Sequence, residues 1–173
     1  MRCFPRSAVG CSVGLIGFSL MIVTTMAHSA QPVDLLKLRD ALCEYETRGC
    51  SARNRMCPDA DDARGLGGEL GFCQLKPETL RQIGFKGKWR TLYVEALDRD
   101  RSKYWAHQKL LHCAQPFYRL IGQRWSMTRQ GYTTAEGFIW CYHYGLDAGK
   151  VDKTDPYVVA VIALYNKALI AQR

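Results

Sequence analysis

The sequence predicts a single, mainly α-helical domain that is stapled by disulfides and follows a signal peptide. Three observations support this fold class. Nearly every segment after residue 30 has its apolar residues at helical rather than alternating spacing. No internal repeat and no linker rich in proline, glycine or serine divides residues 31–173. Of the eight cysteines, two lie in residues 1–30, so an even number, six, remains in the predicted domain.

Residues 1–30 have the layout of a secretory signal peptide. Arg2 and Arg6 give a positive start, residues 8–23 form an apolar stretch, and small residues follow at 27–30. The stretch is shorter than the ~20 residues of a membrane-spanning helix. An uncleaved membrane anchor is the alternative. We therefore expect export to the periplasm or the extracellular space, without stable membrane insertion.

The charge of the chain is basic. It is +8 for the whole sequence and falls to +6 when Arg2 and Arg6 leave with the signal peptide. A basic exported protein suits an anionic partner, such as the cell wall, a membrane surface or nucleic acid. Export and the lack of a recognised nucleic-acid-binding motif speak against nucleic acid.

The six remaining cysteines indicate disulfides rather than a metal site. Fifteen pairings are open from the sequence alone. No CxxC pair occurs, and the histidines lack the spacing of a zinc motif, so we expect neither a metal nor another cofactor. The cysteines are Cys43, Cys50, Cys57, Cys73, Cys113 and Cys141, and the histidines are His107, His112 and His143.

The first half of the domain is predicted to contain two helices separated by a loop. The first covers residues 34–47, with Asp34 as N-cap and Gly49 as its stop. Residues 51–68 are polar and rich in aspartate and glycine, which indicates a loop, and a short hairpin within it is the alternative. A short helix begins at Pro77 and ends near Gly84.

The second half is predicted to be helical throughout. One long helix covers residues 91–113, and another begins at Pro116 and runs to about residue 129. The segment TTAE at residues 133–136 is a capping box that opens a helix ending at Gly145. Asp155 and Pro156 cap the last helix, residues 157–171, whose apolar residues nearly encircle it. We expect such a helix to lie at the centre of the domain.

One carboxylate in the first helix has an unusual predicted environment. With about 100° per residue, Glu46 falls on the stripe that carries Leu38 and Leu42, whereas Glu44 falls on the opposite, polar side. Burial on an apolar face disfavours the charged carboxylate and raises its pKa, as a general acid near neutral pH requires. The alternative is that Glu46 only accepts a hydrogen bond from a buried donor or a cap.

Three motifs in this order resemble the catalytic domain of the soluble lytic transglycosylases, which share the goose-type lysozyme fold. Glu46 and Thr47 stand where that family has its catalytic Glu and a Ser. Residues 68–79 read GELGFCQLKPET where the family has GAxGLMQ followed by PxT. CYHYG at residues 141–145 stands where the family has AYNAG, and YVVAV at 157–161 corresponds to its YVxxV helix. The resemblance covers residues 35–165.

The resemblance implies a lytic transglycosylase that acts on the glycan strands of peptidoglycan with Glu46 as its single acid/base. Glu46 is expected to protonate the glycosidic oxygen between N-acetylmuramic acid and N-acetylglucosamine, and then to deprotonate the muramic C6 hydroxyl so that a 1,6-anhydro ring closes. Thr47 and Tyr142 are expected to hold the Glu46 carboxyl. The substrate-binding residues implied are Thr47, Gly68, Glu69, Gly71, Gln74, Tyr142, His143 and Tyr144, with Gln74 bonding a sugar.

The sequence departs from the family pattern in several places. The segment between Glu46 and Gln74 is longer than in the family, and it carries Cys50 and Cys57, so a disulfide between these two is one way of fastening an enlarged loop. His143 replaces an Asn, which puts sugar preference or rate in doubt. The cysteines of the second and third motifs, Cys73 and Cys141, are expected to lie near one another, or else to be small core residues.

Other residues could contribute to sugar chemistry. Hydrolytic glycosidases usually pair two carboxylates, and Glu69 is the strongest candidate for a second one, ahead of three loop aspartates. Aromatic rings can stack on pyranose rings, and Tyr142 and Tyr144 are the first choices. The aspartates are Asp59, Asp61 and Asp62, and the other aromatic candidates are Trp89, Trp105, Trp125, Tyr132 and Trp140.

Three functions remain open at this point. The first is a lytic transglycosylase that remodels the cell wall or opens gaps for an envelope-spanning secretion or flagellar machine. The second is a muramidase of the same fold, in which water enters instead of the C6 hydroxyl. The third is a catalytically inactive, disulfide-stapled peptidoglycan-binding protein, which His143 and the irregular motifs favour.

Overall fold

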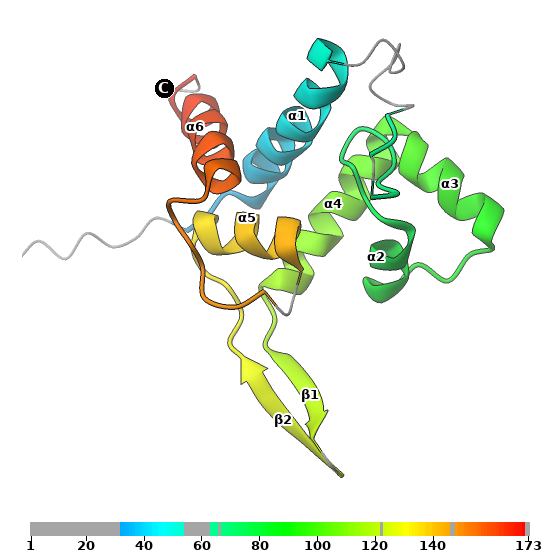
Figure 1. Cartoon of the computed structure of the whole chain (residues 1–173), viewed down its shortest axis with the longest axis vertical. Coiled ribbons are helices and arrows are strands. Elements are labelled where there is room, and N and C mark those ends of the chain that lie inside the picture. Colours follow the sequence, from blue (N-terminus) through cyan, green and yellow to red (C-terminus); the bar gives the residue numbers. More distant parts are fainter. Residues whose placement is uncertain (1–31, 54–62, 66, 122, 146–147, 172–173) are drawn as a thin grey trace, which may run out of the picture. The chain divides into compact units, whose positions relative to one another are not determined.

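Six helices and one β-hairpin make up the part of the chain described in the computed structural model, residues 32–53, 63–65, 67–121, 123–145 and 148–171 (Figure 1). The mainly α-helical fold class is therefore confirmed. The predicted signal peptide, residues 1–30, lies outside the described residues. The elements are α1 (Leu35–Arg53), α2 (Pro77–Gln82), α3 (Trp89–Leu97), α4 (Arg99–Cys113), β1 (Phe117–Ile121), β2 (Arg124–Arg129), α5 (Ala135–Tyr144) and α6 (Pro156–Ile170).

The core lies where α1, α4, α5 and α6 meet. α1 packs against α4 and α6, α4 packs against α3 and α5, and α5 contacts α6 (Figure 1). Each of these helices contributes side chains that are fully shielded from solvent. They include Leu38 and Leu42 from α1, Leu110 from α4, Ile139 from α5, and Val158 and Val161 from α6. No helix in the described residues is long and apolar enough to cross a membrane.

Several predicted helix ends are confirmed by their caps. α2 begins with Pro77 at its first turn, as predicted. α5 ends at Gly145 as predicted, with φ 90°, but its N-cap is one residue later than the predicted capping box at 133–136 requires: Thr134 accepts a hydrogen bond from the Gly137 amide. At the start of α6, the Asp155 carboxylate accepts hydrogen bonds from the amides of Tyr157 and Val158.

The first helix is longer than predicted. α1 continues through Gly49 to Arg53 instead of stopping near residue 47. A glycine inside a helix costs only ~1 kcal/mol relative to alanine. A glycine ends a helix when the glycine itself adopts the left-handed conformation. Gly49 is instead a helical residue, so the helix continues through it. Residues 54–62, half of the predicted loop, lie outside the described part of the chain.

The prediction of one helix over residues 91–113 is wrong, because Asp98 divides it. The backbone of Asp98 is extended, with φ −75° and ψ 127°. Its carboxylate accepts a hydrogen bond from the Arg101 amide and so caps α4. Asp favours this N-cap role, since its side chain satisfies an amide that has no partner within the helix.

The predicted helix over residues 116–129 is also wrong, because this segment forms an antiparallel hairpin. Only two residues separate β1 from β2, the spacing of the commonest hairpin connections. The pair Tyr118 and Met127 lies side by side across the strands, and both side chains are about half exposed. Aromatic and β-branched residues are enriched in strands, and this local preference prevails over the helix-starting tendency of Pro116.

The last helix does not lie at the centre of the domain, contrary to the prediction. α6 buries Val158, Val161 and Tyr165, but Val159 is 52% exposed and Ile170 is 70% exposed. The helix therefore packs with one face against α1 and α5 and leaves the other to solvent (Figure 1).

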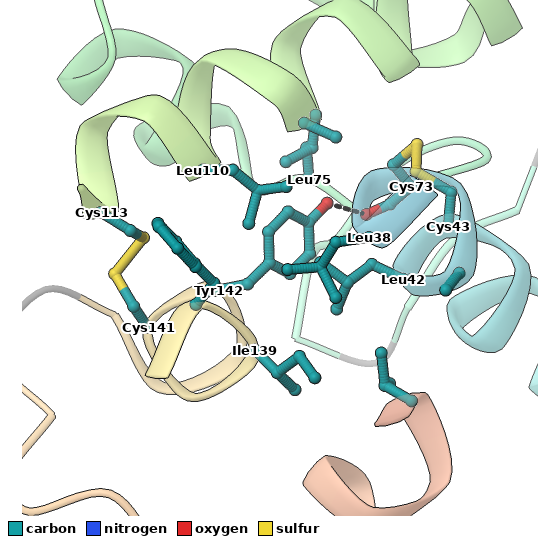
Figure 2. Packing of buried hydrophobic residues seen from close by; sticks show 14 of the residues in the cluster. Leu38, Leu42, Cys43, Cys73, Leu75, Leu110, Cys113, Ile139, Cys141 and Tyr142 are labelled. Carbon is teal, nitrogen blue, oxygen red and sulfur yellow. Dashed lines mark hydrogen bonds between the residues drawn. A yellow bond between two sulfur atoms is a disulfide. The ribbon is translucent and has the colours of Figure 1, made fainter. Parts of the chain in front are cut away.

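Two disulfides join cysteines of the described residues, which confirms the disulfide prediction in part. Cys43 in α1 is bonded to Cys73, and Cys113 in α4 is bonded to Cys141 in α5 (Figure 2). Cys73 and Cys141 thus each have a different partner. The side chains of Cys50 and Cys57, the other predicted pair, lie outside the described part of the structure.

Candidate active site

A short folded-back loop between α1 and α2 carries the second sequence motif. Leu70 exchanges both backbone hydrogen bonds with Leu75, each 3.0 Å long, and also bridges to Arg64. Positive φ angles at Gly68 (85°), Gly71 (73°) and Gln74 (47°) make the loop compact. Glycine adopts such angles at little cost, which explains its presence at 68 and 71.

At Gly71 the backbone of the loop lies against helix α3. A Cβ atom at this position would overlap the carbonyl oxygen of Ala96, near the end of α3. The Gly71 amide donates a hydrogen bond of 2.8 Å to the Ala63 carbonyl. This glycine therefore seats the loop on α3, whereas the sequence motif suggested that it passes close to a ligand.

Glu46 lies near the middle of α1 with its carboxyl partly buried, on the face that carries Leu38 and Leu42, while Glu44 is exposed. The predicted difference between the two glutamates is confirmed. Burial raises the pKa of Glu46, although a hydrogen bond from Tyr157 and the positive charge of Lys109 act in the opposite direction. The negative charge of Glu69 raises it further. Glu46 thus holds its proton to higher pH than an exposed glutamate.

The hydroxyl that holds the Glu46 carboxyl belongs to Tyr157, at the start of α6. Tyr157 Oη donates a hydrogen bond of 2.5 Å to Glu46 Oε1. Its ring meets that of Tyr45 edge to face at 5.0 Å and stacks on the imidazole of His143 at 3.9 Å. The phenol is therefore fixed from two sides.

Thr47 and Tyr142, the residues expected to hold Glu46, donate their hydrogen bonds elsewhere. The Thr47 hydroxyl donates to the carbonyls of Cys43 and Glu44 in its own helix, both at 3.0 Å. The hydroxyl of Tyr142 is buried and donates to the Cys73 carbonyl at 2.8 Å (Figure 2). Tyr142 thereby joins α5 to the loop that carries the second motif.

Lys109 in α4 brings a positive charge close to Glu46. Its Nζ lies 4.2 Å from the centroid of the Tyr142 ring, a cation–π contact. Burial lowers the pKa of Lys109 to about 8, against the opposing effect of the Glu46 charge. Among the described residues, Lys109 forms no ion pair with a carboxylate. At neutral pH it is a largely protonated amine with no acidic partner in the described part of the chain.

Glu69 is a second carboxylate, and its environment lowers its pKa, whereas the environment of Glu46 raises the pKa of Glu46. It accepts a hydrogen bond of 2.9 Å from the Gly67 amide and pairs with Lys76 at 3.1 Å. Partial burial pushes the pKa of Glu69 upward, but hydrogen bonds from its own amide and from Lys76 outweigh this and leave the pKa below its usual value. Glu69 is therefore ionised under conditions in which Glu46 holds its proton.

His143 and Tyr144 form the edge contributed by the end of α5. Burial lowers the pKa of His143, partly offset by the negative charge of Asp155, so the imidazole is neutral at pH 7. Tyr144 Oη donates a hydrogen bond of 2.7 Å to Asp155 Oδ2, and 46% of the residue is exposed. A neutral imidazole and an exposed phenol ring offer polar and stacking contacts to a ligand.

These residues line one pocket with a volume of about 460 Å³. Of the predicted site residues, it brings together Glu46, Glu69, Gln74, Tyr142, His143 and Tyr144. Within the described part of the chain, Thr47, Gly68 and Gly71 do not line it. The lining also contains four residues not predicted for the site: Lys76, Thr79, Lys109 and Gly145.

The Gln74 side chain lines the pocket and also stabilises the loop through hydrogen bonds. Its amide nitrogen donates to the carbonyls of Gly71 at 2.8 Å and Ala63 at 3.3 Å. The predicted contact with a sugar therefore falls to its Oε1 atom, which can only accept a hydrogen bond.

Most of the predicted aromatic candidates serve other contacts. Trp105 donates its indole N–H to Glu95 and packs on Phe85, and Tyr132 donates to the Ala148 carbonyl. Trp89 packs on Tyr93, and Trp140 packs on Tyr144. The side chain of Trp125 and the residues Asp59, Asp61 and Asp62 lie outside the described part.

Two residues central to the site, Lys109 and Tyr157, were not predicted to belong to it. Lys109 follows the buried Ala106 by three positions and precedes the buried Cys113 by four, so a helical wheel of α4 places it beside the buried face. Tyr157 belongs to the YVVAV segment, but its contact with Glu46 spans 111 positions and no local pattern signals it.

Each disulfide joins two segments that contribute to the pocket. Cys43 precedes Glu46 by one turn of α1, and its partner Cys73 is adjacent to Gln74. Cys113 follows Lys109 by one turn of α4, and its partner Cys141 is adjacent to Tyr142. One covalent link therefore ties the helix of Glu46 to the loop of Gln74, and the other ties the helix of Lys109 to the helix of Tyr142.

The arrangement is suited to general acid–base chemistry. Two carboxylates share a pocket, and their environments move their pKa values apart, which is typical of an acid and an ionised partner. Comparison with protein-family models, with characterised proteins and with solved structures found no significant match to this chain.

Proposed function

We propose that this protein is a lytic transglycosylase that cuts the β-1,4 bond between N-acetylmuramic acid and N-acetylglucosamine in peptidoglycan. The observation that carries the proposal is the environment of Glu46. Its carboxyl lines a pocket, burial raises its pKa, and Tyr157 fixes its orientation. A carboxyl in this state can donate a proton to a glycosidic oxygen near neutral pH.

The meeting of the three sequence motifs supports the proposed relationship to the lytic transglycosylases and to the goose-type lysozyme fold. Glu46 comes from the first motif, Glu69 and Gln74 from the second, and Tyr142 to Gly145 from the third, and all of them line the same pocket. The YVVAV segment contributes Tyr157, which contacts the proposed acid. Segments chosen for their likeness to one family thus converge on one site.

In the proposed mechanism, Glu46 acts twice. It first gives its proton to the leaving glycosidic oxygen while the bond from C1 of the muramic ring to that oxygen breaks. The resulting carboxylate then takes the proton of the C6 hydroxyl as O6 bonds to C1. The 1,6-anhydro ring closes, and Glu46 is protonated again.

Tyr157 and Lys109 act on the ionised form of Glu46, which exists between the two proton transfers. Both favour the ionised form of Glu46, one through a hydrogen bond and the other through its charge. They therefore stabilise the carboxylate during the interval in which it has lost its proton. The charge of Lys109 does not keep Glu46 ionised throughout the cycle, because the effect of burial on the pKa of Glu46 is larger.

A muramidase is the second candidate, and Glu69 is the observation that favours it. An ionised carboxylate in the same pocket could activate a water molecule as general base, as inverting glycosidases do. In that case water, rather than the C6 hydroxyl, adds to C1.

Export to the periplasm or the extracellular space is part of the proposal. The signal-peptide pattern of residues 1–30 supports it, as do two disulfides, which persist in oxidising compartments. The charge of +6 expected after removal of the signal peptide suits the anionic cell wall. The glycan strands of peptidoglycan are the proposed partner.

Mass spectrometry of the products tests the proposal and separates the two candidates. Purified peptidoglycan is digested with the oxidised protein lacking residues 1–30 and with its Glu69→Gln variant. A lytic transglycosylase leaves anhydromuramic ends in both digests. Reducing muramic ends that disappear in Glu69→Gln would instead establish a muramidase. Binding to peptidoglycan without any soluble product would leave a binding protein.

A further inference from the structure

We propose that Lys109 binds a free carboxylate of the glycan, so that the pocket prefers muramic acid residues whose lactyl group carries no peptide. The inference rests on the proposed function and narrows its substrate. In peptidoglycan the lactyl carboxyl is either linked to a peptide through a neutral amide or free and negatively charged. The chemical class at issue is therefore an N-acetylated amino sugar that carries a carboxylate.

The charges in the pocket support an anionic ligand. Glu69 and Lys76 pair with each other and cancel. Glu46 is neutral when it is ready to act as an acid. Lys109 has no carboxylate partner among the described residues, so its charge is the one that stays unbalanced among the described lining residues when Glu46 is protonated.

The position of Lys109 is fixed. Its ammonium lies over the Tyr142 ring. Figure 2 shows how that ring is held by the hydrogen bond from its hydroxyl to the Cys73 carbonyl. One turn further along α4, Cys113 is bonded to Cys141, the residue next to Tyr142. An amine anchored in this way has lost much of its freedom before a ligand arrives, which favours binding.

Lys109 and Glu46, the proposed acid, line the same pocket. The charge of each of these two groups also shifts the pKa of the other. The bond to be cut is at C1 of the muramic ring, and the lactyl group is carried by that same ring. Removing an unpaired ammonium from water is costly, and a ligand carboxylate would offset the cost with a charge-assisted hydrogen bond.

Binding of single sugars to the oxidised protein tests the inference without requiring turnover. Dissociation constants are measured by NMR titration for N-acetylmuramic acid, its methyl ester and N-acetylglucosamine. We expect the free acid to bind about tenfold or more tightly than the other two, the value of one charge-assisted hydrogen bond. Lys109→Met should remove this preference. Lys103→Met, which removes a lysine from the same helix outside the pocket lining, should keep it.

A second measurement covers the case in which Lys109→Met does not fold. The preference of the unaltered protein for the free acid is measured at about pH 6 and at about pH 10, on either side of the pKa of about 8. Glu46, Glu69 and Lys76 act on Lys109, and Lys109 in turn lowers the pKa of His143 in the same pocket. At the higher pH Lys109 has lost its proton, and Glu46 and Glu69 are ionised and disfavour an anion, so the preference should vanish.

The outcomes are distinct for the two proposals. Equal binding of all three sugars, or a preference that survives Lys109→Met, would overturn the role of Lys109 and leave the proposed function intact. Failure of the unaltered protein to bind any of the sugars, or longer peptidoglycan fragments, would count against the proposed function itself.

Discussion

The hydroxyl of Tyr157 donates a hydrogen bond to the carboxyl of Glu46 across 111 positions of the sequence. This contact connects the start of α6 to α1 at the pocket. It also favours the ionised form of Glu46, whereas burial favours the neutral form, and the balance leaves the pKa above its usual value. The reactivity proposed for Glu46 therefore depends on the packing of two helices.

Replacing Tyr157 by Phe should move the alkaline limit of activity to higher pH. Loss of the hydrogen bond removes an effect that lowers the pKa of Glu46, so the acid stays protonated further into the alkaline range. We also expect the rate at the optimum to fall about tenfold to a hundredfold, because the carboxyl is less well positioned. The measurement is the pH profile of kcat/KM.

Tyr165→Phe is the matched control for this change. Tyr165 lies in the same helix, and its hydroxyl accepts a hydrogen bond from the amide of Asp34, which immediately precedes α1 and is remote from Glu46 in that helix. Either substitution should lower the free energy of unfolding by about 1 kcal/mol. If the alkaline limit of activity moved equally in both variants, the shift would come from a general loss of stability and not from the bond between Tyr157 and Glu46.

Glu46→Gln should stabilise the protein at neutral pH while removing its activity. The pKa of Glu46 is raised in the folded state, so its stabilising contribution is full below about pH 4.3 and is lost as the pH rises through the folded-state value. Glutamine avoids this loss, and we expect a gain on the order of 1 kcal/mol near pH 7. Urea denaturation at several pH values checks this; a gain that does not grow with pH would contradict it.

The two disulfides should contribute about equally to stability. They close loops with sequence separations of 30 and 28 residues. Loop-closure entropy gives about 3.6 kcal/mol for either loop. Because the loops do not overlap, replacing both pairs by serine should cost about the sum of the separate losses. Chemical denaturation of the variants measures this, and a pair whose removal costs nothing would disprove the account for that pair.

Gly71→Ala should be far more damaging than Gly68→Ala. Both residues have positive φ, so alanine at either position costs about 1–2 kcal/mol of backbone strain. Only at position 71 does the new Cβ also overlap the Ala96 carbonyl, whereas position 68 has open space around it. The additional overlap should cost about 1–3 kcal/mol more. Thermal unfolding of both variants measures the difference, and equal losses would contradict the packing of the loop on α3.

The parts of the fold that follow from local rules could be predicted from the sequence. The environment of Glu46 follows from the spacing of Leu38 and Leu42, and the starts of α2 and α6 follow from Pro77 and Asp155. The break at Asp98 also follows from a local preference, that of Asp for the N-cap position. It was missed because the residues on both sides of Asp98 have helical spacing.

The remaining differences arise from competition between local rules or from contacts distant in sequence. At Pro116, a residue that suits the first turn of a helix precedes residues that favour strands, and the strand preference prevails. The pairing of Cys73 with Cys43, and the contacts of Tyr157 and Lys109 with the site, depend on how helices far apart in sequence pack together. Periodicity and capping cannot reveal such contacts.

The central claim is that Glu46 is the acid of a peptidoglycan-cleaving site, and release of soluble muropeptides from purified peptidoglycan tests it most directly. Glu46→Gln is compared with Glu44→Gln, which changes an exposed glutamate of the same helix. We predict that Glu44→Gln retains the full rate and that Glu46→Gln loses at least about a hundredfold, the contribution of a general acid. Equal rates of release by the two variants would contradict the claim.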